Sequence, residues 1–126
     1  MIKRYENISR REFLDKFFSL WNVLLPETHK LTNKEVQFLT EVLLLPTKYK
    51  YSRFSTAARK VLTAKFKESG WELSPQGFSQ LVKSLMDKGI VLIDSDDIKY
   101  IHPKLEKSID TTRTEYLFQF QFKIKE

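Results

Sequence analysis

The chain has 126 residues, the length of one ordinary domain. Its hydrophobic fraction of 41%, with 10 Phe residues, is too high for a disordered chain, and the absence of cysteine excludes disulfides, thiolate zinc sites and a cysteine nucleophile. The net charge of +6 permits nucleic acid as a partner without requiring it.

The first expected helix begins at a capping box, Ser9-Arg10-Arg11-Glu12, in which the hydroxyl and the carboxylate satisfy free backbone N–H groups. Apolar residues then recur at steps of three and four until Pro26 ends the helix. They are Phe13, Leu14, Phe17, Phe18, Trp21, Leu24 and Leu25. This stripe either completes the core of the chain or pairs with a second copy, and both alternatives stay open.

A second capping box, Thr32-Asn33-Lys34-Glu35, predicts a helix from Asn33 to Leu45 that Pro46 closes. The apolar residues of this helix cover almost all of its sides, which is typical of a central helix. They are Phe38, Leu39, Val42, Leu43 and Leu45.

The segment from Val42 to Lys67 contains seven basic residues and no acidic one. The rest of the chain carries 15 basic and 16 acidic residues, a net charge of −1, so the whole positive excess belongs to this segment. Its basic residues are Lys48, Lys50, Arg53, Arg59, Lys60, Lys65 and Lys67. Interleaved Tyr49, Tyr51 and Phe54 favour nucleic acid, because rings stack on bases while cations meet phosphates. A solvated charged face and core aromatic residues are the alternatives.

Ser55 or Thr56 predicts the start of a third helix that runs to Gly70. After a short link, Ser74 and Pro75 supply the N-cap and first position of a fourth helix. Gly89 stands where a left-handed residue ends this helix, with Ile90 folding back on Leu85. The apolar stripe of the fourth helix is Phe78, Leu81, Val82 and Leu85.

After Gly89 the pattern changes to β-structure. Val91–Ile93 and Ile98–Ile101, joined by Asp94-Ser95-Asp96-Asp97, predict a tight hairpin that His102-Pro103 ends. We expect a loop from Glu106 to Thr114 and a half-buried strand from Tyr116 to Ile124.

The order of these elements resembles a winged helix-turn-helix domain. The stretch Ser74–Val91 is similar to the recognition helix and following strand of that superfamily, which includes the multiple-antibiotic-resistance regulators and plasmid or phage replication initiators, and Leu31–Glu35 resembles the opening of its first helix. Tyr100–Leu105 and the lack of cysteine also resemble small phage-encoded winged-helix proteins. The resemblance covers residues 31–103 and implies a winged-helix domain there. Together with the patterns on either side, it predicts an α+β, mainly helical fold with an N-terminal helical extension over residues 1–30 packed on the same domain and a loop and C-terminal strand over residues 104–126.

The resemblance implies that the helix after the turn, here the expected fourth helix, enters the major groove, while the preceding helix and the hairpin wing touch the backbone or minor groove. Helical geometry places a polar face opposite the apolar stripe, and its Gln and Lys side chains suit adenine and guanine edges. We therefore predict base readout by Gln76, Ser79, Gln80 and Lys83. The predicted phosphate contacts are Lys48, Lys50, Arg53, Arg59 and Lys60. Ordinary solvent-facing helix residues are the alternative interpretation of the polar face.

The expected wing argues against DNA, because it carries Asp94, Asp96 and Asp97 against Lys99 alone and would face phosphate with like charge. Either the wing points away from the duplex or the domain serves protein binding. The aspartates lack the glycine and distal glutamate of a calcium loop, so we assign them to a turn.

No pattern in the sequence indicates catalysis, a metal or a cofactor. His29 and His102 lie in loop-like contexts without a nucleophile motif, and three glycines are too few and too dispersed for a phosphate-cradling loop. We therefore expect a non-enzymatic protein.

The leading hypothesis is a winged-helix protein that binds double-stranded DNA, a phage-type regulator of transcription or replication. The alternative is a structural or adaptor protein with the same fold, such as a phage virion or assembly component. A homodimer or larger homo-oligomer through the N-terminal helix or the C-terminal strand also remains open. Because the chain has no run of 18 apolar residues and a charged start, we expect no membrane partner and a location in the cytoplasm, or in the virion if the protein is phage-encoded.

Overall fold

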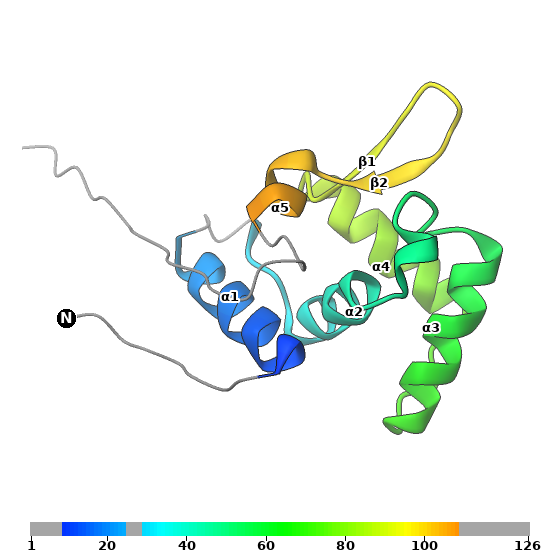
Figure 1. The fold of residues 1–126 in the computed structure, drawn as a ribbon, viewed down its shortest axis with the longest axis horizontal. Coiled ribbons are helices and arrows are strands. Elements are labelled where there is room, and N and C mark those ends of the chain that lie inside the picture. Colours follow the sequence, from blue (N-terminus) through cyan, green and yellow to red (C-terminus); the bar gives the residue numbers. More distant parts are fainter. Residues whose placement is uncertain (1–8, 25–28, 109–126) are drawn as a thin grey trace, which may run out of the picture.

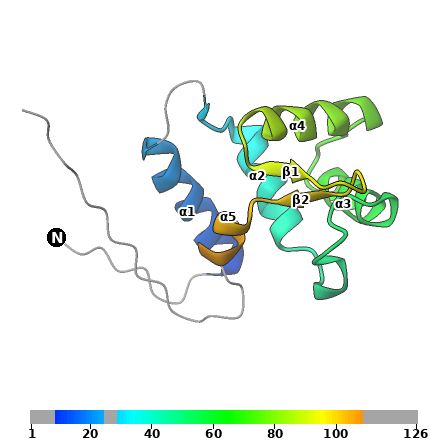
Figure 2. The same cartoon turned by 90° about the horizontal axis from the view of Figure 1, so that it is seen from above.

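The computed structural model describes residues 9–24 and 29–108. Within these ranges the chain forms five α-helices and one two-stranded antiparallel sheet (Figures 1 and 2), which confirms the expected α+β, mainly helical class. The elements are α1 (Arg10–Leu24), α2 (Asn33–Leu43), the short 3₁₀ helix η2 (Thr47–Tyr49), α3 (Thr56–Glu68), α4 (Pro75–Asp87), β1 (Val91–Ile93), β2 (Lys99–Ile101) and α5 (Pro103–Ser108). The expected strand from Tyr116 to Ile124 lies outside the described residues.

Side-chain caps begin the helices where the sequence predicts them. The Thr32 hydroxyl accepts a hydrogen bond from the Glu35 backbone N–H at 3.1 Å, and the Glu35 carboxylate accepts one from the Thr32 N–H at 2.9 Å. The Ser55 and Ser74 hydroxyls cap α3 and α4 by accepting hydrogen bonds from the backbone N–H groups of Ala58 and Gly77. Ser9 accepts a bond from the backbone N–H of the fourth residue in its predicted capping box, at 3.1 Å.

The end of α2 differs from the expectation, since the helix stops at Leu43 rather than Leu45. The Leu45 N–H donates to the Val42 carbonyl, so the last turn has tightened before Pro46. A proline disfavours the helical conformation of the residue before it, which explains the early stop.

Two left-handed glycines end the next helices. Gly89 has a φ of +75°, and the Ile90 N–H donates to the Leu85 carbonyl at 2.9 Å, which is the predicted Schellman ending of α4. Gly70 has a φ of +84° and ends α3 in the same way. The turn at Gly89 leads the chain directly into β1.

A core of aromatic rings joins the helices. The Phe38 ring of α2 lies 5.9 Å from the Phe66 ring of α3 and 5.1 Å from the Phe78 ring of α4, measured between centroids. Leu14 and Phe18 of α1 are buried in the same core. These two side chains therefore complete the core of this chain.

Polar contacts fix α1 against α2. The Asn22 amide donates to the Leu31 carbonyl at 2.8 Å and accepts from the Leu31 N–H at 2.7 Å, and Arg11 forms an ion pair with Glu41. Both pairs join α1 to residues at or near α2, so α1 belongs to the same packed unit.

The hairpin confirms the predicted change of pattern, with Val91 opposite Ile101 and Ile93 opposite Lys99. The Asp94 carboxylate accepts hydrogen bonds from the backbone N–H groups of Asp96 and Ile98, at 2.8 and 3.0 Å. Asp94 therefore closes the turn, the role that its residue type predicts.

The chain after the hairpin forms a helix, α5, over Pro103–Ser108. The prediction of a loop that begins at Glu106 is therefore wrong for residues 106–108. Pro103 fits the first helical position, where no N–H is needed. The His102 ring accepts a hydrogen bond from the Lys104 N–H at 3.1 Å and acts as the cap. Leu105 is buried and holds the short helix on the core.

Candidate nucleic-acid interface

Helix α4 has one buried and one exposed face. Phe78, Val82 and Leu85 are buried in the core. The four residues predicted for base readout are all exposed on the opposite side: Gln76, Ser79, Gln80 and Lys83. We call these four residues the polar face of α4.

The cations predicted to bind phosphate fall into different environments. Lys48, Lys50 and Lys60 are exposed. The Lys50 ammonium lies 5.8 Å from the ring centre of Tyr51, whose side chain is 86% exposed. An exposed ring beside a cation is compatible with stacking on a base while the cation meets a phosphate. Phe54, by contrast, packs against the core, which is the alternative interpretation of the interleaved rings.

Arg53 turns away from solvent. Its side chain is only 10% exposed and forms an ion pair with Glu106 of α5. Burial lowers the pKa of the guanidinium, which nevertheless stays charged at neutral pH. Arg53 thus ties the segment between η2 and α3 to α5. Sequence reasoning missed this pair because it placed Glu106 in a loop.

Arg59 occupies an unusual position at the start of α3. Its guanidinium lies 4.6 Å from the ring centre of Phe78, within cation–π range. The Arg59 Nε atom is buried and has no hydrogen-bond partner among the described residues. A buried donor without an acceptor costs roughly 1–3 kcal/mol, so the side chain is held in this position at a cost in stability.

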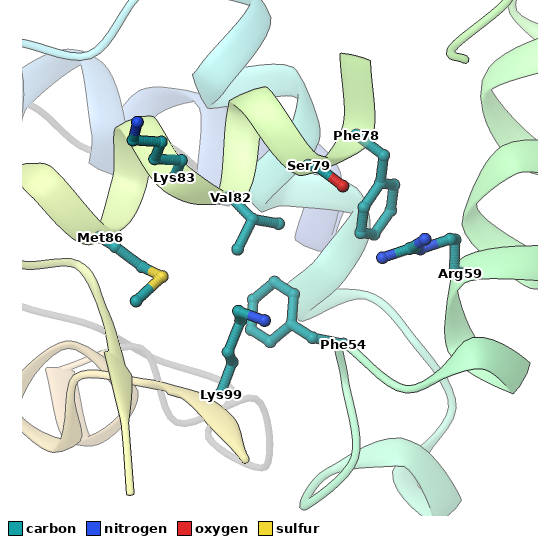
Figure 3. Close-up of a pocket in the computed structure, with 8 residues that line it drawn as sticks. All are labelled: Phe54, Arg59, Phe78, Ser79, Val82, Lys83, Met86 and Lys99. Carbon is teal, nitrogen blue, oxygen red and sulfur yellow. The ribbon is translucent and has the colours of Figure 1, made fainter. Parts of the chain in front are cut away.

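A hollow lies between α3, α4 and β2 (Figure 3). Arg59, Lys83 and Lys99 line it from these three elements, and no carboxylate is among the lining residues. Figure 3 shows Arg59 extending from α3 toward the hollow and Lys99 rising from β2 beside the Phe54 ring, whereas Lys83 points away. Its lining residues are Phe54, Arg59, Phe78, Ser79, Val82, Lys83, Met86 and Lys99. The polar face of α4 contributes Ser79 and Lys83, so the hollow adjoins that face.

Sequence reasoning missed Lys99 as a site residue. The signal was present, because the alternation of β2 puts Lys99 on the same side of the strand as the core residue Ile101. A count of charges over the whole wing does not separate this inward-facing lysine from the aspartates of the adjoining turn.

Comparison of the chain with protein-family models, curated proteins and solved structures finds no match. We therefore infer function from the chemistry of the surface residues. Over residues 9–24 and 29–108, no helix is both long and apolar enough to cross a membrane. In the same ranges no three His, Asp or Glu side chains are grouped to hold a metal ion.

A buried polar network holds α4 in place against α2. The Glu35 carboxylate accepts hydrogen bonds from the Ser84 hydroxyl, at 2.8 Å, and from the Lys88 ammonium, which also donates to the Lys30 carbonyl at 2.9 Å. Burial raises the pKa of Glu35, but the bonds from Lys88, the Thr32 N–H and Ser84 outweigh it, so the pKa lies below its ordinary value of 4.5. The ionised carboxylate is therefore the form that fixes the C-terminal end of α4.

Proposed function

We propose that the chain is a non-enzymatic winged-helix protein that binds double-stranded DNA, with α4 entering the major groove. The observation that carries this proposal is the polar face of α4, whose four side chains are exposed while the opposite face is buried. The succession of α2, α3, α4 and the β1–β2 hairpin supports the winged-helix assignment. The regulation of transcription or replication in the cytoplasm, as in a phage-type regulator, is the role that we propose for such a protein.

The exposed cations support the same proposal. Lys48 and Lys50 lie in and just after η2, and Lys60 lies on α3. No acidic residue occurs between Glu41 and Glu68 in the sequence. Such lysines neutralise phosphates and release counterions, which is the main source of affinity for DNA. We leave Arg53 out of this set because Glu106 already engages it.

Fluorescence anisotropy with labelled duplex DNA at about 50 and about 200 mM salt tests the proposal. If Lys48, Lys50, Arg59 and Lys60 contact phosphates, log K should fall with log salt at a slope of roughly −4. Replacing Lys48 and Lys50 by Gln should reduce the slope by roughly two. A wild-type chain that binds no duplex at the lower salt concentration contradicts the proposal.

The matched control is the double substitution Lys65→Gln with Lys67→Gln. It removes the same charge from the same acid-free segment, at the other end of α3. We expect this control to change the slope by less than about one. An equal loss in both double variants would mean that the segment acts only through its total charge.

Base readout needs a separate experiment, which is selection of bound duplexes from a random-sequence library. Gln80→Ala should weaken the preference at one base position by about 1–3 kcal/mol without changing the free energy of unfolding, because Gln80 is exposed. Gln37→Ala, at an exposed position of α2, should leave the selected sequence unchanged.

A second candidate is a structural or adaptor protein that acts through the hairpin. Ile93, Ile98 and Tyr100 are 45%, 49% and 38% exposed beside the acidic turn, a composition that fits a protein surface better than phosphate. Light scattering tests the self-associating form of this candidate. It predicts a mass that rises with protein concentration and falls to that of the monomer in Ile98→Asp, together with no binding of duplex DNA.

A further inference from the structure

We propose that the hollow between α3, α4 and β2 seats one phosphate group of the DNA backbone, held between Arg59 and Lys99. The inference rests on the proposed DNA-binding function and adds Lys99 of the wing to the binding surface. Its ligand is a phosphodiester group, whose oxygens can accept hydrogen bonds from a guanidinium and an ammonium together.

The charge around the hollow is the first argument. Arg59 and Lys99 reach the hollow from α3 and β2, and neither has an ion-pair partner within the described parts of the chain, whereas Lys83 lines the hollow but points away from it (Figure 3). Two cations that face one hollow without a carboxylate repel one another, and an anion placed between them relieves that repulsion. Lys88 in the interior shows the opposite arrangement, since it has a carboxylate and a carbonyl as acceptors.

The Arg59 side chain is the second argument. Its guanidinium lies 4.6 Å from the centre of the Phe78 ring, and its Nε–H is enclosed by protein without an acceptor in the part of the chain that the structure describes. The terminal N–H groups of the guanidinium, which extends toward the hollow in Figure 3, are the donors that a phosphate oxygen can reach. Ser79 adds a hydroxyl at the same hollow, while Phe54 and Val82 supply apolar walls that reduce the access of water.

The position of Lys99 removes the objection raised by the acidic wing. Lys99 is the first residue of β2 and lines the hollow, whereas the turn that contains Asp94, Asp96 and Asp97 projects beyond the helices (Figure 1). The wing therefore presents one cation to the hollow, from the end of β2 that adjoins the acidic turn. A phosphate in the hollow can contact the Lys99 side chain, whereas no aspartate of the turn is among the lining residues.

A double-mutant cycle on DNA binding tests the proposal. Lys99→Gln and Arg59→Gln should each weaken binding roughly three- to tenfold and reduce the salt slope by about one. Because both side chains hold the same phosphate, the double variant should also lose only about one in slope. Losses that add up to about two would show two separate contacts and overturn the proposal.

Controls separate this inference from the proposed function. Lys67→Gln removes one exposed charge from α3 away from the hollow and should weaken binding less than about twofold. If wild-type chain binds DNA but Lys99→Gln behaves like Lys67→Gln, the phosphate seat is wrong while the DNA-binding proposal stands. If wild-type chain does not bind DNA, both fail. A thermal unfolding curve shows whether Arg59→Gln is folded. If it is not, the comparison of Lys99→Gln with Lys67→Gln alone decides the proposal.

Amide NMR distinguishes a backbone phosphate from free phosphate. Duplex DNA should shift the amide resonances of Arg59, Ser79 and Lys99, and the shifts at Arg59 and Ser79 should shrink in Lys99→Gln. Shifts produced by inorganic phosphate, combined with DNA binding that Lys99→Gln leaves unchanged, would assign the hollow to a free anion and overturn the proposal.

Discussion

Glu35 at the start of α2 and Lys88 at the end of α4 form a buried ion pair, with side chains 3% and 15% exposed. The same carboxylate closes the capping box of α2 and accepts the Ser84 hydroxyl. One side chain therefore begins a helix and also determines how α4, the helix of the candidate interface, packs on it. Removing either charge leaves the other buried without its partner, which is costly in a protein interior.

We expect Glu35→Gln to lower the free energy of unfolding at pH 7 by roughly 2–4 kcal/mol. Glutamine keeps the shape of the side chain but not the charge that Lys88 requires. The Lys88→Met variant should be destabilised as well, and the double variant should lose less than the sum of the two single losses. Urea denaturation measures all three, and additive losses would mean that the two side chains are not coupled.

The same pair predicts a pH dependence. The pKa of Glu35 in the folded chain lies below its ordinary value of 4.5, so its stabilising contribution is present above that pH and is lost as the pH falls through the folded-state value. The wild-type chain should therefore lose more stability than Glu35→Gln between about pH 5 and about pH 3. Parallel pH curves for the two proteins would contradict this assignment.

Replacement by Gln should affect stability at Arg53 and the salt dependence of DNA binding at Lys50. Arg53→Gln breaks the ion pair with Glu106 and should reduce the free energy of unfolding by about 1–3 kcal/mol without changing the salt slope of DNA binding. Lys50→Gln, at an exposed position, should reduce the slope by about one and leave stability unchanged. A reduced slope in folded Arg53→Gln would return Arg53 to the set of phosphate contacts.

The sequence predicts the helix starts at Thr32, Ser55 and Ser74 and the turn at Gly89 because each depends on residues within a few positions of one another. The polar face of α4 follows from helical geometry for the same reason. These features are local, so a pattern in the sequence is enough to place them.

The ion pairs and the hollow that define the candidate site join residues far apart in the sequence. Lys88 and Glu35 are 53 positions apart, and neither this pair nor the pair between Arg53 and Glu106 has any signal in sequence spacing. The hollow likewise needs the packing of α3, α4 and β2 before Arg59 and Lys99 meet. Charge counts along the chain therefore locate a basic segment, but they do not distinguish a cation held in an internal ion pair, such as Arg53, from one that is exposed to a ligand.

Gly89 makes a further prediction about the turn into β1. Its φ of +75° lies in the left-handed region, and a Cβ placed there would meet no atom within 4 Å, so the cost of a side chain is conformational rather than steric. Gly89→Ala should lower the free energy of unfolding by about 1–2 kcal/mol, and Gly89→Asn by less, because Asn tolerates this region. Equal stability of the wild-type and Ala proteins in urea denaturation would show that the turn does not need a left-handed residue.

The tip of the wing is expected to stay away from the DNA. Asp96→Asn with Asp97→Asn removes two negative charges and keeps a residue that tolerates the φ of 61° at position 97, while Asp94 continues to close the turn. Because the turn projects beyond the helices, this change should raise affinity for duplex DNA less than about twofold at about 150 mM salt, where charges more than roughly 8 Å apart are largely screened. Asp87→Asn, at an exposed position of α4 one turn beyond Lys83, should raise affinity more, because it removes repulsion beside the polar face. If the tip variant gained as much as Asp87→Asn in anisotropy titrations, the acidic turn would have to lie against the phosphate backbone.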